Sequence, residues 1–290
     1  MYKVIIYVQS VFYNYYLTLI KHFVSTGEIK VVGIVTDNED INDTIDGFEV
    51  LRTSECSSIS FDYALVENFN VNIPKEKMIK IEVLRLPYFS FDKYVKLLKN
   101  PISIFSTNCW AGLCYHYLGL PFSSPTINMF FRLPEFNKFL KNLDYYLSIP
   151  LKFLHDEFEP NLKRNYPVCS LGDLTLHFNH YLSFEEANAA WERRKKRVNK
   201  NNVLAISMAT DNLKDVAIEF DALPIKNKII FTSYNLHKQV SSSYPLNYPA
   251  STDADGSKFS MYINESAFGA TSFINLFALL CGEKNFKRTK

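Results

Sequence analysis

The sequence predicts two α/β domains, each with a mostly parallel sheet flanked by helices, and the N-terminal domain is expected to be Rossmann-like. The chain has 290 residues, and at about 150 residues per domain this length suits two domains. Short apolar runs alternate with helical patterns from the N-terminus onward, which is typical of α/β folds. The alternation begins again near residue 102, after a segment punctuated by Pro87 and Pro101. The domains are therefore expected at residues 1–92 and 93–290.

Composition excludes several classes of protein. Hydrophobic residues make up 47% of the chain and charged residues 21%, which excludes an intrinsically disordered chain. The 32 basic and 30 acidic side chains leave a net charge of +2, so no nucleic-acid partner is expected. The apolar runs are too short to span a membrane, and no signal peptide is visible. Five cysteines without a C-x-x-C pair indicate no disulfide framework, so a cytoplasmic location is expected.

The first domain is expected to begin with a β-α-β unit. Residues 3–8 and 29–35 are predicted strands, and residues 12–24 between them show helical spacing that Gly27 is expected to end. Further elements of this domain are predicted as strands at 48–51 and 63–66, and a short helix is predicted at 91–98, at the junction of the two domains. The first strand leads into residues 9–12, which contain no glycine. Because the pyrophosphate of NAD normally approaches a glycine-rich turn there, NAD binding is not expected. Whether the domain binds any other cofactor is left unknown by the sequence.

The second domain repeats the alternation of strands and helices. Strands are predicted at residues 102–106, 174–181, 203–207 and 228–232. Helices are predicted at residues 107–118, 134–147, 183–198, 213–220 and 267–281. Three serines, two prolines and an Asp-Gly pair predict a long polar loop over residues 241–258.

A candidate nucleophile lies where the strand at 102–106 ends and a helix begins. Open α/β sheets bind ligands at this edge, and the positive end of a helix dipole lowers the pKa of a cysteine in the first turn. Cys109 is therefore a candidate catalytic nucleophile, and Asn108 is a candidate substrate contact. In the alternative interpretation, Cys109 is a buried packing residue beside Trp110, and Asn108 only caps the helix.

A second candidate site lies in the polar cluster of residues 173–181. Its polar and apolar residues alternate with period two, which predicts a strand with Asp173 and His177 on one face and His180 on the other. Asp173 and His177 are candidate catalytic acid–base residues, and His180 is a candidate substrate contact. The two histidines do not share a face, so no metal site is expected. The alternative is that these histidines have a structural role between the domains.

A third candidate site is basic. On the helix predicted at 183–198, Arg194 falls on the stripe that otherwise carries apolar residues, and residues 193–197 concentrate positive charge. Arg194 and Arg197 are therefore candidate contacts for phosphate or carboxylate, and a solvated helix face is the alternative. Residues 253–256, Asp-Ala-Asp-Gly, have the spacing with which some sugar transferases hold a divalent metal, but an ordinary turn is the preferred explanation because Asp and Gly are common turn residues.

Several of these segments resemble a known family. Asn108-Cys109-Trp110, Ser124-Pro125-Thr126 and His177-Phe178-Asn179-His180-Tyr181 resemble the bacterial domain-of-unknown-function family 1919, often labelled exopolysaccharide biosynthesis protein. The resemblance covers roughly residues 95–235, and the N-terminal domain looks like the Rossmann-like partner sometimes fused to this family. It implies a role in cell-surface polysaccharide assembly, and Ser124 in the Ser-Pro-Thr motif becomes a candidate substrate contact.

The leading hypothesis is a cytoplasmic transferase, for glycosyl or acyl groups, that acts on a sugar or sugar phosphate. It requires the helix start at Asn108, the edge with Asp173 and His177, and Arg194 to converge on one cavity in the second domain. The first alternative is a noncatalytic module that binds a glycan precursor or assembles with a partner. The second is a hydrolase that uses Cys109, His177 and Asp173.

Overall fold

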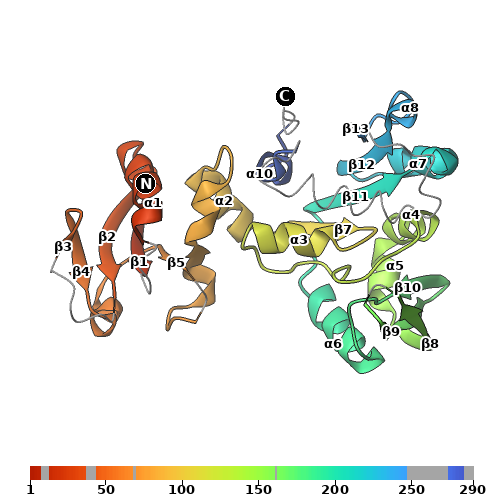
Figure 1. Ribbon diagram of the computed structural model, residues 1–290, viewed down its shortest axis with the longest axis horizontal. Helices are drawn as coiled ribbons and strands as arrows, with labels where there is room; N and C mark the ends of the chain where they lie inside the picture. The colour runs from red at the N-terminus through yellow and green to blue at the C-terminus, as the bar shows by residue number, and fades with distance from the viewer. Residues whose placement is uncertain (8–12, 37–43, 68–69, 161, 247–273, 284–290) are drawn as a thin grey trace. The chain divides into compact units, whose positions relative to one another are not determined.

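The computed structural model describes residues 1–7, 13–36, 44–67, 70–160, 162–246 and 274–283 (Figure 1). The chain divides into two compact units, residues 1–99 (unit 1) and 100–290 (unit 2). The prediction of two α/β domains is confirmed, because each unit contains parallel strands flanked by helices. The division follows helix α2 (Phe91–Lys99), and the predicted boundary after residue 92 lies inside this helix. The predictions for residues 9–12, 253–256 and 267–273 lie outside the described residues.

Unit 1 is built on a sheet with the described strands in the order β3-β4-β2-β1-β5-β6. The strands are β1 (Tyr2–Tyr7), β2 (Ile29–Val35), β3 (Thr44–Ile45), β4 (Phe48–Leu51), β5 (Tyr63–Val66) and β6 (Met78–Lys80). All neighbours run parallel except β3 and β4. The helices are α1 (Tyr13–Ser25), α2 and the 3₁₀ turns η1 (Thr53–Ser58), η2 (Lys75–Lys77) and η3 (Ile81–Arg85). Gly27 ends α1 with a positive φ of 74°, which glycine adopts without strain.

Unit 2 contains a parallel sheet in the order β13-β12-β11-β7. Its strands are β7 (Ser103–Ser106), β11 (Val203–Ala209), β12 (Asn227–Ser233) and β13 (Ser243–Leu246). The described helices are α3 (Trp110–Tyr117), α4 (Leu133–Lys141), α5 (Leu143–Ser148), α6 (Phe184–Lys195), α7 (Lys214–Ala222), α8 (Tyr234–His237), α10 (Leu276–Leu280) and the 3₁₀ turn η4 (Asp211–Leu213). The prediction of a loop from residue 241 is wrong for β13, whose backbone pairs with β12.

A second, antiparallel sheet in unit 2 was not predicted. Its strands are β8 (Lys152–Glu159), β9 (Arg164–Leu171) and β10 (Leu174–His177), in the order β10-β9-β8. Gly172 makes the turn between β9 and β10 with a φ of 63°. Phe130 pairs with the end of β10, because its amide donates to the His177 carbonyl at 2.9 Å and its carbonyl accepts from the His177 amide at 3.2 Å.

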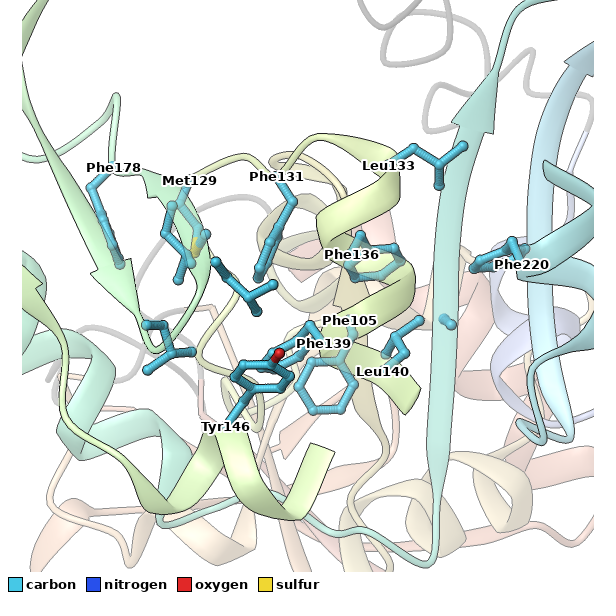
Figure 2. Packing of buried hydrophobic residues seen from close by; sticks show 14 of the residues in the cluster. Phe105, Met129, Phe131, Leu133, Phe136, Phe139, Leu140, Tyr146, Phe178 and Phe220 are labelled. Carbon is cyan, nitrogen blue, oxygen red and sulfur yellow. The ribbon is translucent and has the colours of Figure 1, made fainter. Parts of the chain in front are cut away.

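The main core of unit 2 is aromatic and lies around α4 (Figure 2). The ring of Phe139 is 5.3 Å from that of Phe131, 5.6 Å from that of Phe105 and 5.9 Å from that of Tyr146, measured between ring centroids. The single helix predicted over residues 134–147 is wrong, because Asn142 has nonhelical angles of φ −124° and ψ 42° and separates α4 from α5. Asparagine competes with the helix by local hydrogen bonding, which suits it to such a break.

The beginning of unit 2 is held by Asn199, in the loop before β11. Its amide donates to Ser103 Oγ at 2.7 Å, and its side-chain Nδ2 donates to Asn100 Oδ1 at 2.8 Å and to the Pro101 carbonyl at 3.0 Å. Asn202 adds a bond from its Nδ2 to the Asn100 carbonyl at 3.0 Å. Residues 100–103 are therefore fixed by the loop that precedes the next strand of the sheet.

Candidate functional site

Three of the candidate residues of unit 2 lie in or contact one connecting segment, residues 118–132, which joins α3 to α4: Ser124 lies within it, His177 pairs with its Phe130, and Arg194 donates to its Ile127 carbonyl. Thr126 Oγ1 accepts a hydrogen bond from the Ser106 amide at 3.3 Å, beside the start of α3. One residue later, the Ile127 carbonyl accepts from Tyr181 Oη at 3.0 Å. Phe130 then pairs with His177. The connecting segment thus contacts the end of β7, Tyr181 shortly before α6, and the end of β10 in turn.

At the start of α3, the first amides are already bound within the chain. Asn108 Oδ1 accepts from the Trp110 amide at 3.1 Å, and Ser106 Oγ accepts from the Ala111 amide at 3.0 Å. Burial raises the pKa of the Cys109 thiol to about 11. The expectation of a lowered pKa is wrong, because burial disfavours the thiolate more than the backbone hydrogen bond at Cys109 favours it. A Cys109 thiolate is therefore not part of the function proposed below.

Ser124 lies inside the connecting segment and is fully buried. Its hydroxyl shares a hydrogen bond of 3.1 Å with Thr126 Oγ1 and accepts from the Thr126 amide at 3.3 Å. These contacts shape the turn that leads to Ile127. Its predicted role as a substrate contact stays a prediction.

Arg194 is the most unusual charged residue of the described chain. It lies in the last turn of α6 with only 7% of its surface exposed. Its Nη1 donates to the Ile127 carbonyl at 3.4 Å and to Tyr181 Oη, and its Cζ is 5.5 Å from the centre of the Phe122 ring. Its Nε is buried without a hydrogen-bond partner. Among the described residues, all polar partners of this guanidinium are neutral.

Two more guanidinium groups belong to the same region. Arg193 and Arg197 are exposed on the surface at the end of α6. The pKa of Arg197 is lowered by burial and then by the positive charges of Arg193 and Arg194. Arg197 therefore lies close enough to both neighbours to be affected by their positive charges. We call Arg193, Arg194 and Arg197 the arginine cluster.

His177 lies at the end of β10 with 5% of its surface exposed. Its ring is stacked on Phe130, with centroids 4.4 Å apart and an interplanar angle of 5°. Its Nδ1 is 3.4 Å from Glu157 Oε2 and 3.5 Å from Tyr166 Oη, and Tyr166 Oη donates to Glu157 Oε2 at 2.6 Å. His177 thus has a carboxylate partner, but the partner is Glu157 on β8 and not the predicted Asp173.

Asp173 and His177 do not form the predicted pair. Asp173 is exposed in the turn between β9 and β10, where it accepts from Tyr146 Oη at 2.7 Å and forms an ion pair with Lys138. The strand predicted over residues 174–181 is too long, because β10 spans only Leu174–His177, and Asp173 precedes it in the turn. His180 is exposed after the end of β10.

Four residues with prominent roles in this geometry were not predicted as site residues: Phe122, Glu157, Tyr166 and Tyr181. Tyr181 falls in the segment 177–181 that resembles the family, and this resemblance was the available signal for it. Glu157 lies on β8, a strand that was not predicted from the sequence, so nothing in the sequence indicated that Glu157 would face His177. Across the described ranges, no group of three or more His, Cys, Asp or Glu is arranged to hold a metal, and no helix is long and apolar enough to cross a bilayer.

Comparison with known proteins assigns both parts of the chain. Residues 80–276, more than half of the chain, match the family described as "Domain of unknown function (DUF1919)". The chain belongs to the DUF1919 family. Residues 1–85 match the family described as "C2185-like, N-terminal". A protein of Haemophilus influenzae named "Uncharacterized protein" is 38% identical to this DUF1919 protein over 138 residues, which are 47% of this chain and 64% of the relative.

Proposed function

We propose that this DUF1919 protein binds a phosphate-bearing sugar at the arginine cluster and acts as a transferase in cell-surface polysaccharide assembly. The observation that carries the proposal is the buried Arg194 guanidinium, whose described partners are all neutral. Exopolysaccharide biosynthesis is the label often attached to the family, and it supplies the biological setting. A cytoplasmic location is part of the proposal, on the ground that five cysteines without a C-x-x-C pair suggest no disulfide framework.

Burying a guanidinium is costly unless a negative group compensates its charge. The effective penalty is several kcal/mol per ion, and buried arginines are usually paired with carboxylates for this reason. Carbonyl, hydroxyl and ring contacts from Ile127, Tyr181 and Phe122 reduce the cost but leave a full positive charge. The unpartnered Nε still has a hydrogen to donate. A bound anion would supply both the missing charge and the missing acceptor.

Phosphate fits the arginine cluster better than a single carboxylate does. Three guanidinium groups follow one another at and just after the end of α6, and the positive charges of Arg193 and Arg194 disfavour the charged form of Arg197. A phosphate monoester carries up to two negative charges and three acceptor oxygens, and it pairs with the planar guanidinium in a bidentate manner. The proposed substrate is therefore a sugar phosphate or a nucleotide sugar rather than a neutral sugar.

For unit 1 we propose a Rossmann-like domain. Its parallel strands, numbered along the chain as β1, β2, β4, β5 and β6, lie in the order β4-β2-β1-β5-β6. Written by rank this is 3-2-1-4-5, the strand order of doubly wound dinucleotide-binding sheets without the final strand. No cofactor is assigned to this domain.

The proposal is tested by ligand binding to the full-length chain. Titration calorimetry with glucose 1-phosphate, UDP-glucose, inorganic phosphate and glucose is carried out on wild type, Arg194→Gln and Lys196→Gln. We expect phosphate-bearing ligands to bind wild type and glucose not to bind. Arg194→Gln should weaken binding at least about tenfold, the loss of one charge-assisted hydrogen bond of about 1.5–3 kcal/mol.

Lys196→Gln is the matched control, because it removes one positive charge from the exposed surface at the end of the same helix. Its affinity should stay within about threefold of wild type, since exposed charges contribute little. The proposal fails if no phosphate-bearing ligand binds, or if the two variants lose the same affinity. Circular dichroism checks that Arg194→Gln retains its fold.

A further inference from the structure

One face of the antiparallel sheet carries a polar side chain from each of its strands. Glu157 on β8 is directly opposite Tyr166 on β9, and His177 on β10 is opposite Val168, two residues along β9. These three side chains hydrogen-bond or approach one another as described above. Tyr166 and His177 are buried, whereas the Glu157 side chain is 41% exposed. The cluster thus joins a buried imidazole to the solvent through a carboxylate.

We propose that His177 is an acid–base group whose Nδ1–H is held by Glu157 and Tyr166, so that Nε2 carries the basic lone pair. Glu157 and Tyr166 are positioning residues in this assignment. The geometry supports it, because both oxygens approach Nδ1, while no described residue forms a hydrogen bond with Nε2. The hydrogen bond at one ring nitrogen decides which nitrogen is protonated. The stacked Phe130 ring then fixes the plane of the imidazole.

Burial and the charges around His177 keep its imidazole neutral, which is the form that a general base needs. Burial lowers the pKa of His177 most, and Glu157 opposes this by attraction, while Arg132 lowers it and Glu135 raises it. The imidazole is therefore neutral at pH 7. The hydrogen bond from Tyr166 lowers the pKa of Glu157, so its carboxylate is ionised at the same pH. A neutral base next to an ionised carboxylate is the arrangement that stabilises an imidazolium when it forms.

The proton transfer balances without a further reactant. Nε2 takes a proton from a substrate hydroxyl: the O–H bond breaks, its electron pair stays on oxygen, and an N–H bond forms. The imidazolium is stabilised by Glu157 and returns the proton to the leaving group or to water. This cycle suits an attack by a sugar hydroxyl in group transfer. The inference does not depend on the arginine cluster, because it concerns the state of His177 in the ligand-free protein.

The first test is ¹⁵N NMR of the full chain with labelled histidine. The His177 signals are assigned by their loss in His177→Asn. We expect a neutral, Nδ1-protonated ring at pH 7 and, in Glu157→Gln, a His177 pKa lower by about 0.5–1 unit because the attracting charge is gone. His155→Gln is the control: His155 Nε2 is 3.3 Å from Glu157 Oε1, so this change removes another partner of Glu157 and should leave the His177 pKa in place. An Nε2-protonated ring, or a His177 pKa that Glu157→Gln leaves unchanged, overturns the inference.

The second test separates proton transfer from a purely structural role. Diethyl pyrocarbonate modifies only an unprotonated nitrogen that a reagent can reach, and peptide mass spectrometry locates the product. We expect His177 to be modified at pH 7 and protected as the pH falls through its pKa. Tyr166→Phe keeps the ring and should raise the pKa of Glu157, since it removes the hydroxyl that donates to the carboxylate. A His177 that stays unmodified at every pH overturns the inference, whereas weakened phosphate binding in Arg194→Gln bears only on the proposed function.

Discussion

Replacing Phe139 with alanine should cost unit 2 about 4 kcal/mol of unfolding free energy. Phe139 is fully buried, and its ring meets those of Phe105, Phe131, Tyr146 and Trp191 at centroid distances of 5.6, 5.3, 5.9 and 6.4 Å. Buried Phe→Ala changes typically cost about 3–5 kcal/mol, from lost transfer energy and from the cavity. Because rings from β7, the connecting segment, α5 and α6 surround the site, they cannot all close onto it.

The assay is urea unfolding followed by tryptophan fluorescence. Both tryptophans of the chain, Trp110 and Trp191, belong to unit 2, so this signal reports on unit 2 alone. With an m-value of about 2 kcal/mol/M, the midpoint should fall by about 2 M. Phe158→Ala is the matched control, because Phe158 is 62% exposed and its loss should cost less than about 1 kcal/mol. A loss below about 2 kcal/mol for Phe139→Ala would refute the assigned packing.

Three further outcomes follow from local contacts. Ser183→Ala should lower the urea midpoint of unit 2 by the equivalent of about 1 kcal/mol, because Ser183 Oγ accepts from the Glu186 amide and caps α6; an unchanged midpoint would contradict this cap. The rate at which iodoacetamide alkylates Cys109 should keep rising with pH up to a pH of about 11, because only the thiolate reacts. A rate that levels off near pH 7 would contradict the raised pKa of Cys109. Asp173→Asn should lower the midpoint at pH 7, since Lys138 lowers the pKa of Asp173 below 3.8 in the folded chain. A carboxylate whose pKa is lowered in the folded chain stabilises the fold at pH values above its unfolded-state pKa, and this stabilisation is lost as the pH falls through the folded-state pKa. The difference in urea midpoint between Asp173→Asn and wild type should therefore vanish at that low pH. A difference that persists there would exclude this ion pair.

The strands and helices of the β-α-β unit could be predicted because their signals are local. The predicted strand at 29–35 is β2, and the helix at 12–24 differs from α1 by one residue at each end. Apolar periodicity and a terminating glycine suffice for such elements. The break at Asn142 was missed because the apolar stripe continues across it into Tyr146, and periodicity does not register a single nonhelical residue.

The antiparallel sheet was missed for a different reason. Nearly all of β8 is exposed, so it has no alternating buried face, and Pro167 lies within β9, where proline usually argues against a strand. Without β8, the sequence offered Asp173 as the only nearby carboxylate for His177. The position of Arg194 on the apolar stripe was visible in the sequence. Its neutral partners come from distant segments and could be found only in the folded chain.

The contacts of Asn199 define where an isolated unit 2 can begin. Trimming to Asn100 preserves both acceptors of the Asn199 side chain, at Asn100 and Pro101. Trimming to Ser103 deletes both and leaves two ties between this loop and Ser103, from the Asn199 amide to Ser103 Oγ and from the Ser103 nitrogen to the Asn202 carbonyl. A shortened protein intended for ligand soaking or NMR should therefore keep Asn100 and everything after it, even though its first ordered strand starts three positions later.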